Sequence, residues 1–525
     1  MIDVVVGLAV AASLAVSLLR WLRVAQREHY GAGRVRVICT LWLARSPSDM
    51  ALALVAVAFV VAAAVVPLAA PDGSALALVA LPAAAVAAVV PLGLSVRGRT
   101  SRLAWTGRLR RLAAGWSLLV LALGAVLWWL AGAGATAVLA VTVPVTMDVA
   151  LWVLERVERR LSAPFVAQAQ RRLARVRPKV VAVTGSYGKT STKGYIAHLL
   201  SGARAVVASP ASFNNRLGLS RAVNDHLVEG TEVFVAEMGT YGPGEIRELC
   251  RLFPPDIAVI TTIGEAHLER MRSTETVLAA KSEITEQAGT VVLPIDDPRL
   301  AALADRCEAA GKRVIRCSVV EGAADVTGGD VASRDATADV VVDRSRGQVR
   351  IGDTALELGE VPHGVNLAVA LGVALALDVQ PSALAPLASL PRAAHRAEVH
   401  EGSGVAVIDD TYNANPIGAH QALAEAAAIA RRRGGPLVVV TPGMVELGPV
   451  QRDRNAAFGR ACAEAGATVI VVGRTNRAAL ADGARAGGVE PEVVDRREQA
   501  VPRAMALAAE RGVVLYENDL PDHYP

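Results

Sequence analysis

The chain has 525 residues, of which 53% are hydrophobic, and its mean hydropathy of +0.38 is high for a soluble protein. This length exceeds one ordinary domain, and the five cysteines have no paired spacing that would indicate a disulfide framework or a zinc site. Residues 1–180 contain 20 basic and 7 acidic residues, whereas the remainder is acidic overall. A basic and apolar first third indicates a membrane, and the acidic remainder argues against nucleic-acid binding.

Five apolar stretches precede residue 155, and most of them have about the 20 residues that a helix needs to cross a bilayer. They are residues 4–19, 50–70, 75–96, 112–131 and 133–153. The first has Asp3 but no basic residue before it and no clear cleavage site, so we interpret it as an uncleaved span. The sequence therefore predicts a membrane region over residues 1–155 with five transmembrane helices.

Arginines cluster in alternate loops of this region. Six lie between the first and second stretches, six lie between the third and fourth, and more follow the fifth, whereas the loops near Asp72 and Gly132 have none. By the positive-inside rule, this multi-pass region has its N-terminus outside, and everything after the fifth span is cytoplasmic. Residues 156–178 are then a basic juxtamembrane linker. Asp148 lies toward the cytoplasmic end of the last stretch, where we expect it to be hydrated rather than functional.

Residues 179–192 have the layout of a phosphate-binding loop. A β-branched run predicts a buried strand, Gly185 and Gly188 predict a loop, and a helical pattern follows. Backbone N–H groups at the helix start would face a phosphate, Lys189 would add a point charge, and the Thr190 hydroxyl suits Mg²⁺. Only two residues separate the glycines, where the common form has four, so an ordinary glycine turn is the alternative. The coincidence of strand, glycines, Lys and Thr favours phosphate binding.

Polar side chains follow two later strands of the α/β pattern. Glu237 ends the strand predicted at residues 232–237, and His267 follows the strand predicted at residues 256–263. Ligands of open parallel sheets bind beyond the carboxyl ends of the strands, so Glu237 is placed to reach Mg²⁺ at the phosphate loop. A lone His is usually structural, but its position gives His267 more weight. Lys281 lies on a predicted helix and has no role by composition alone.

Strand and helix patterns alternate to the end of the chain. They predict a central P-loop, parallel-sheet domain at residues 179–395 and a smaller Rossmann-like domain at residues 396–525. A proline-containing hinge at residues 379–396 would join them. The predicted fold class is α/β with an N-terminal helical membrane region.

Seven stretches in this order resemble motifs of the Mur ligase family of ATP-dependent amide-forming enzymes. They are TGSYGKTSTK (184–193), SFNNRLGL (212–219), VAEMGTYGPGEI (235–246), ITTIGEAHLE (260–269), AAKSEI (279–284), HGVNLAVAL (363–371) and VIDDTYNANP (407–416). The resemblance covers roughly residues 179–480 and is greatest to the branch that adds D-alanyl-D-alanine to a cell-wall precursor peptide. It implies that the ATP γ-phosphoryl group activates a carboxylate, which an amine then attacks.

The resemblance also implies individual roles. The residues that would bind ATP are Gly185, Ser186, Gly188, Lys189, Thr190, Ser191, Asn366 (on the adenine side), Arg396, Asp410 and Tyr412. The implied Mg²⁺ ligands are Thr190, Glu237, His267 and, if carbamylated, Lys281, and the catalytic set is Lys189, Lys281, His267 and Glu237. Asn214, Asn215, Asn413 and Asn415 would contact the substrate, although by pattern alone residues 212–218 are a polar turn with a cap before a helix.

The chain also departs from the family pattern. We expect the membrane region to stand where the family has its UDP-sugar-binding domain, and TPGMVELG (441–448) and the tail YENDLPDHYP (516–525) differ as well. The expected partners are a peptide-bearing cell-wall precursor, which a membrane region would allow to be lipid-linked, and an amino acid or dipeptide. Another cell-wall or poly-γ-linked polymer is the close alternative. A P-loop ATPase that energises transport is an alternative from another class, although the spans have few polar residues for a substrate path.

Overall fold

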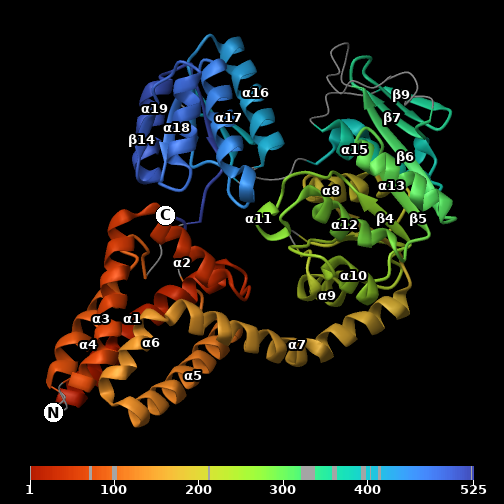
Figure 1. The fold of residues 1–525 in the computed structure, drawn as a ribbon. Coiled ribbons are helices and arrows are strands. Elements are labelled where there is room, and N and C mark those ends of the chain that lie inside the picture. The colour runs from red at the N-terminus through yellow and green to blue at the C-terminus, as the bar shows by residue number, and fades with distance from the viewer. Residues whose placement is uncertain are drawn as a thin grey trace.

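Three parts follow one another in the computed structural model: a helical N-terminal region, a central α/β part and a C-terminal α/β part (Figure 1). The structure describes residues 2–525 except 70–73, 97–102, 211–212, 321–336, 358–362, 392–397, 403, 412–414 and 522. The α/β fold class is confirmed for both later parts.

The N-terminal region is a bundle of helices. Its elements are α1 (Ile2–Arg27), α2 (Arg34–Arg45), α3 (Pro47–Ala69), α4 (Ser74–Val89), α5 (Gly107–Ala131), η1 (Ala133–Thr136), α6 (Ala137–Val141) and α7 (Val143–Val176). The five apolar stretches lie in helices for most of their length, but the fifth is divided at Thr142 between α6 and α7.

Two helices of the described part, Val4–Arg27 and Gly107–Ala131, are long and apolar enough to cross a bilayer. Two bent helix pairs raise this number to four if each pair counts as one span. They are α2 with the first part of α3, bent by 115°, and residues 133–141 with α7, bent by 74°. Five spans, and their orientation, stay a prediction.

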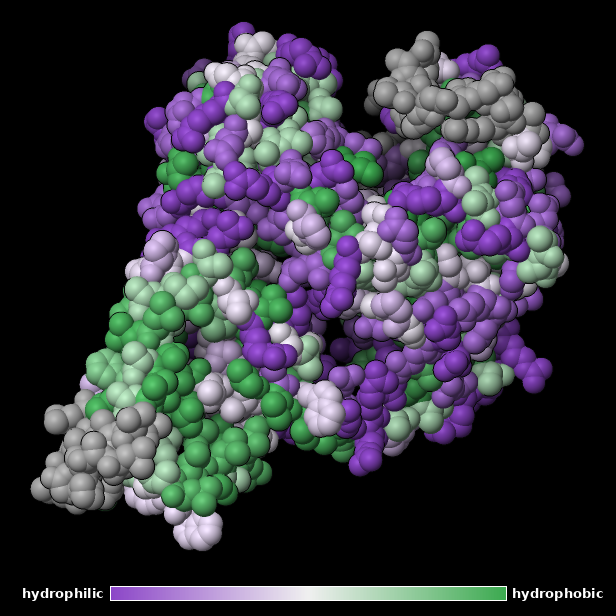
Figure 2. All heavy atoms as spheres, in the orientation of Figure 1, coloured by the Kyte–Doolittle hydropathy of each residue, from purple (hydrophilic) through white to green (hydrophobic). Residues whose placement is uncertain are grey.

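Large apolar side chains face outward on these helices. Leu8, Leu118, Leu121 and Trp129 are 66%, 68%, 69% and 83% exposed. Figure 2 shows hydrophobic residues gathered over the N-terminal region, whereas most of the remaining visible surface is hydrophilic. An apolar surface of this extent is typical of contact with lipid or with another protein.

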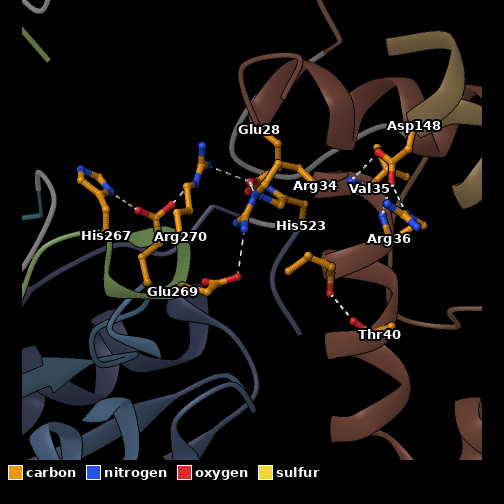
Figure 3. Close-up of polar contacts among 12 residues, drawn as sticks. Glu28, Arg34, Val35, Arg36, Thr40, Asp148, His267, Glu269, Arg270 and His523 are labelled. Carbon is orange, nitrogen blue, oxygen red and sulfur yellow. Dashed lines mark hydrogen bonds and ion pairs between the residues drawn. The ribbon is translucent and has the colours of Figure 1, made fainter. Parts of the chain in front are cut away.

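The structure corrects the prediction for Asp148. Its carboxylate is buried and accepts hydrogen bonds from the backbone N–H groups of Val35 (3.2 Å) and Arg36 (3.1 Å), at the first turn of α2. It also pairs with the Arg36 side chain at 3.0 Å (Figure 3). Gly33, at the N-cap position, offers no side chain to these N–H groups. Asp148 is therefore a buried helix cap and not a hydrated carboxylate.

The segment predicted as a linker is helical. Because α7 runs without a break to Val176, residues 156–176 continue the last apolar helix. Ala169 and Leu173 pack into the core of the central part, and Arg172 donates hydrogen bonds to the carbonyls of Asn224 (2.7 Å) and Leu227 (2.5 Å). The helical region and the central part are thus joined by a packed helix.

The central part is built on a nine-stranded sheet in the order β2-β3-β1-β4-β5-β6-β7-β8-β9. Its strands are β1 (Lys179–Thr184), β2 (Val206–Ala208), β3 (Val233–Glu237), β4 (Ile257–Ile260), β5 (Thr290–Pro294), β6 (Arg313–Val320), β7 (Val340–Asp343), β8 (Gln348–Ile351) and β9 (Thr354–Glu357). Its helices are α8 (Lys189–Leu200), α9 (Arg216–His226), α10 (Glu245–Leu252), α11 (Leu268–Met271), α12 (Thr274–Ser282), η2 (Glu283–Thr285), α13 (Pro298–Ala309) and α15 (Gly364–Ala376).

Two helical layers cover this sheet. Helices α8 and α15 pack on one face, and α9, α10, α12 and α13 pack on the other. Strand β1 lies between β3 and β4 and runs parallel to both. The loops that follow these three strands therefore meet at one edge of the sheet.

The C-terminal part is a six-stranded sheet in the order β10-β11-β15-β12-β13-β14, in which only β10 is antiparallel to its neighbour. Its strands are β10 (Glu398–Gly402), β11 (Val405–Asp410), β12 (Leu437–Thr441), β13 (Thr468–Val472), β14 (Glu492–Val494) and β15 (Val513–Glu517). Its helices are α16 (Pro416–Arg433), η5 (Gly448–Val450), α17 (Gln451–Glu464), α18 (Arg477–Ala486) and α19 (Arg497–Ala508).

The predicted hinge contains two short turns, η3 (Pro381–Ala383) and η4 (Leu387–Ser389). Its last residues, which hold the predicted boundary between the two α/β domains, lie outside the described residues.

Candidate active site

The glycines of the predicted phosphate loop are held between two other elements. Gly185 (φ +154°) and Gly188 (φ +79°) adopt backbone conformations that favour glycine. A Cβ atom on Gly185 would overlap the side chain of Thr261, after β4, and one on Gly188 would overlap the amide of Asn366, at the start of α15. Asn366, predicted on the adenine side, thus lies directly against the loop.

Two lysines meet at one carbonyl oxygen of this loop. Lys189 and Lys281 donate from Nζ to the Gly185 carbonyl at 2.8 and 3.0 Å. Lys281 is 2% exposed, and burial together with the positive charge of Lys189 holds its pKa well below the usual lysine value. No carboxylate pairs with Lys281 among the described residues. Positive charge concentrated at the N-terminus of α8 is suited to an anion.

The predicted metal ligands Thr190 and Glu237 are adjacent. The Thr190 hydroxyl donates to Glu237 Oε2 at 3.0 Å, and the carboxylate is 2% exposed. Asn214, predicted to contact substrate, lies 3.4 Å from Glu237 Oε1. Hydroxyl and carboxylate oxygens suit Mg²⁺. Because no cluster of three His, Cys, Asp or Glu side chains occurs in the described residues, Mg²⁺ would take its other ligands from phosphate and water.

Sequence reasoning missed Lys193. Its Nζ lies 3.0 Å from Glu237 Oε2, and the pair is almost fully buried. Lys193 follows Thr190 by three residues on α8, so both side chains lie on one helix face. That spacing could have identified it once Glu237 was placed beside Thr190.

Three other predicted ATP ligands, Ser186, Ser191 and Asp410, lie on described elements of the two α/β parts. The Ser186 hydroxyl accepts a hydrogen bond from the Gly264 N–H at 2.9 Å and so ties the phosphate loop to the segment after β4. Ser191 is buried in the first turn of α8. Asp410 ends β11 opposite Glu517 of β15.

The predicted substrate ligands include two helix caps. Asn215 and Asn415 accept hydrogen bonds from the N–H groups of Gly218 and Gly418, at the N-termini of α9 and α16. Asn215 therefore has the capping role that its turn pattern alone indicates. Arg396, Tyr412 and Asn413 lie outside the described residues.

His267 lies at the contact between the central and C-terminal parts. Its Nδ1 pairs at 2.6 Å with Oε2 of Glu446, which follows β12, and the Tyr241 ring meets it edge-on at 4.9 Å. The structure therefore brings together Lys189, Lys281, Thr190 and Glu237, but pairs His267 with the C-terminal part. Glu446 was missed, and no spacing in the sequence links it to His267.

A second set of buried charges, here called the junction cluster, connects all three parts of the chain (Figure 3). Glu28, between α1 and α2, accepts from Arg34 at 2.5 Å and pairs with His523 of the C-terminal tail at 2.9 Å. Arg34 also pairs with Glu269 of α11 at 2.9 Å, and Arg270 lies 3.6 Å from Glu28. The helical region thus contacts the same short helix that follows His267.

The fold and this site define a class, that of proteins in which an α/β domain with a glycine loop at a helix N-terminus is followed by a second, smaller α/β domain that contacts it near His267. The Mur ligase middle domain matches residues 183–361, and the Mur ligase glutamate ligase domain matches residues 395–516. A relative from Rhodopseudomonas palustris, named UDP-N-acetylmuramoylalanine–D-glutamate ligase, is 30% identical over 71% of this chain and 72% of its own length. The chain belongs to the Mur ligase family.

Other relatives are similar over a shorter length. The UDP-N-acetylmuramoyl-tripeptide–D-alanyl-D-alanine ligase of Mycobacterium leprae is 36% identical over 45% of this chain and 48% of its own. The chain spans about half the length of the curated relatives that it matches in this way. The crystal structure of MurF ligase from Thermotoga maritima in complex with ADP has a TM-score of 0.52 and 26% identity, covering 68% of this chain and 80% of its own.

Proposed function

We propose that this protein is a membrane-anchored amide ligase of peptidoglycan precursor synthesis that uses ATP and Mg²⁺. The observation that supports this most is the pair of lysines at the Gly185 carbonyl, beside the adjacent Thr190 and Glu237. Family membership favours a ligase over a transport ATPase. The relatives named as D-alanyl-D-alanine ligases favour D-alanyl-D-alanine, or a similar amine, as the acceptor.

The reaction has two steps. A carboxylate oxygen of the precursor peptide attacks the γ-phosphorus of ATP, which gives an acyl phosphate and releases ADP. The acceptor amine then attacks the acyl carbon, the C–O bond breaks, and phosphate leaves as the new amide loses a proton. Lys189 and the α8 N-terminus would orient the phosphates and offset their charge. Mg²⁺ beside Thr190 and Glu237 would neutralise further phosphate charge.

We also propose that Lys281 is carbamylated. A lysine with a lowered pKa is a neutral amine in a larger fraction of molecules, and a neutral amine adds CO₂ to form a carbamate. Carbamylation would replace a positive charge beside Lys189 with a negative one. An anion there would attract the Lys189 ammonium or Mg²⁺ and remove the repulsion between the two lysines.

The membrane anchor rests on two apolar helices of spanning length and on the outward-facing apolar side chains. With the predicted orientation, the α/β parts lie in the cytoplasm, where ATP is available. The continuous α7 would hold the central part at a fixed distance from the membrane surface.

An isotope experiment tests this function. Full-length protein in detergent receives ATP, Mg²⁺, D-alanyl-D-alanine and a UDP-linked muramoyl tripeptide whose terminal carboxylate contains ¹⁸O. The proposal predicts a product with the mass of the amide and one ¹⁸O atom in the released phosphate. Amide formed without ¹⁸O in phosphate would contradict the acyl-phosphate step, and ATP hydrolysis without amide from any donor or acceptor amine would contradict the ligase.

A further inference from the structure

A cavity of about 480 Å³ lies between the helical region and the C-terminal part. One wall is α2, which presents Val37, Leu41 and Ala44 along one face at intervals of four and three residues. The opposite wall consists of the segment after β12, the start of α17 and the start of α18. This volume is within the usual range for binding sites of small molecules.

Charged side chains flank this apolar wall. Arg45 of α2 and Arg452 of α17 line the cavity from opposite sides. Arg45 is exposed and has no ion-pair partner in the part of the chain that the structure describes. Among the residues that the structure describes, Arg452 pairs with Asp482, and because both side chains are more than half exposed this pair is weak.

The acidic lining residues are already paired. Glu269 pairs with Arg34, and Glu446 pairs with His267. The charge that remains available to a ligand in the cavity is therefore positive. Phosphate groups are strong partners for arginine, because the guanidinium donates two parallel hydrogen bonds.

The position of the cavity relates it both to the membrane and to the candidate active site. Arg45 ends α2 two residues before α3 begins at Pro47, and the chain bends there by 115°. By the predicted topology this bend lies at the cytoplasmic membrane surface, at the depth of lipid phosphates. At its other end the cavity is lined by Glu446, the partner of His267.

We propose that this cavity binds the phosphate-bearing head of a lipid-linked substrate. The arginines bind the phosphate or diphosphate, and the apolar face of α2 packs against the first carbons of the lipid chain. A membrane-embedded carboxylate donor would then be held between the helical region and the C-terminal part, on the side of the cavity where Glu446 pairs with His267. This inference rests on the proposed function and adds that the carboxylate donor of the ligation is linked to a lipid.

A binding experiment tests the cavity independently of ligation. Full-length protein in detergent is titrated with farnesyl diphosphate, a soluble polyprenyl diphosphate, while ADP and Mg²⁺ occupy the phosphate loop. Inorganic diphosphate and farnesol are the control ligands, because they correspond to the polar half and the apolar half of farnesyl diphosphate. We expect farnesyl diphosphate to bind more tightly than either half, and Arg45→Glu to raise its Kd by about tenfold or more.

Two further variants separate the cavity from general charge effects. Ala44→Trp fills the cavity without changing its charge and should also weaken binding of farnesyl diphosphate. Arg110→Glu changes the same charge on an exposed residue in the first turn of α5, outside the cavity, and should leave binding unchanged. Equal binding by all three variants, or equal affinity for inorganic diphosphate alone, would overturn the proposal.

Ligation then distinguishes the possible occupants. Arg45→Glu should raise KM for a lipid-linked tripeptide donor while leaving kcat and the KM for D-alanyl-D-alanine unchanged. A rise in KM for D-alanyl-D-alanine instead would mean that the cavity holds the amine acceptor, and it would contradict the lipid proposal. If the wild-type protein forms no amide with any donor, the proposed function fails, whereas the binding result stands by itself.

Discussion

The phosphate loop and the junction cluster both bury charge, but they balance it differently. At the loop, the amines of Lys189 and Lys281 meet at one carbonyl, and Lys281 has no carboxylate partner among the described residues. At the junction, Glu28 lies between Arg34 and His523, and Arg34 also pairs with Glu269.

This difference favours a binding role for the loop and a structural role for the junction. Burial and the nearby Lys189 disfavour the charged form of Lys281, so the loop is stabilised when an anion arrives and offsets that repulsion. At the junction, the carboxylates of Glu28 and Glu269 already pair with Arg34 and His523, so the charges there need no added anion. Substitutions at the loop should therefore change catalysis more than folding, and substitutions at the junction should do the reverse.

The largest effect on activity is expected for Lys189→Ala. By the proposed function, Lys189 would face the phosphates of ATP, and removing its charge should lower kcat for ligation about a hundred- to a thousandfold. The matched control is Lys179→Ala, which removes an exposed lysine of the same strand-loop unit, paired with Asp256. Steady-state phosphate release measures both variants. Equal losses in the two would show that the loop charge has no specific role.

Lys281→Ala should lower kcat for ligation by about a hundredfold. The same variant shows whether the working form of Lys281 is the carbamate or the free amine. If the carbamate is the working form, acetate or formate should restore part of the activity by supplying an anion in the vacated space. Methylamine is the matched control, because it would supply a cation. Rescue by methylamine and not by carboxylates would contradict carbamylation.

Glu28→Ala should act mainly on stability. It removes the carboxylate that pairs with His523 and one of the two that pair with Arg34, whose pair with Glu269 remains. Breaking a buried pair typically costs up to about 3–5 kcal/mol. Hydrogen exchange in the tail from residue 520 and in α11 should accelerate, because these segments lose their shared partner. Unchanged exchange in both segments would show that Glu28 does not join the three parts.

The smallest effect is expected for Arg454→Ala. Arg454 pairs with Glu265 across the two α/β parts at 2.5 Å, but its side chain is 47% exposed. Exposed ion pairs contribute about 0–1 kcal/mol to stability, so hydrogen exchange in α11 should change little in this variant. If Arg454→Ala accelerated hydrogen exchange in α11 as much as Glu28→Ala does, the burial of the ion pair would not explain the difference between the two contacts.

The sequence predicts the strand, the glycine loop and the helix at residues 179–200 well because their determinants are close together in the chain. Strand, glycines, Lys189 and Thr190 fall within a dozen residues, and Glu237 follows a strand that parallel-sheet topology places beside them. The capping role of Asn215 was visible in the same way, from one turn of sequence.

The junction could not be predicted in this way. Its members Glu28, Arg34, Glu269 and His523 are separated by up to 495 positions, and no local pattern links residues so far apart. Asp148 was misjudged for a similar reason, since the N–H groups that it caps belong to α2, more than a hundred residues earlier. Long-range pairing of charges depends on the packed fold, which hydropathy and helix periodicity do not describe.

The most direct test of the account is the ratio of amide formed to ATP consumed by the full-length protein in detergent. With Mg²⁺, D-alanyl-D-alanine and a muramoyl tripeptide offered in UDP-linked and lipid-linked forms, wild-type protein should form one amide for each ADP with at least one donor. Lys189→Ala should form neither product. ATP consumption that is independent of both donor and amine would contradict the central claim that this phosphate loop serves amide ligation.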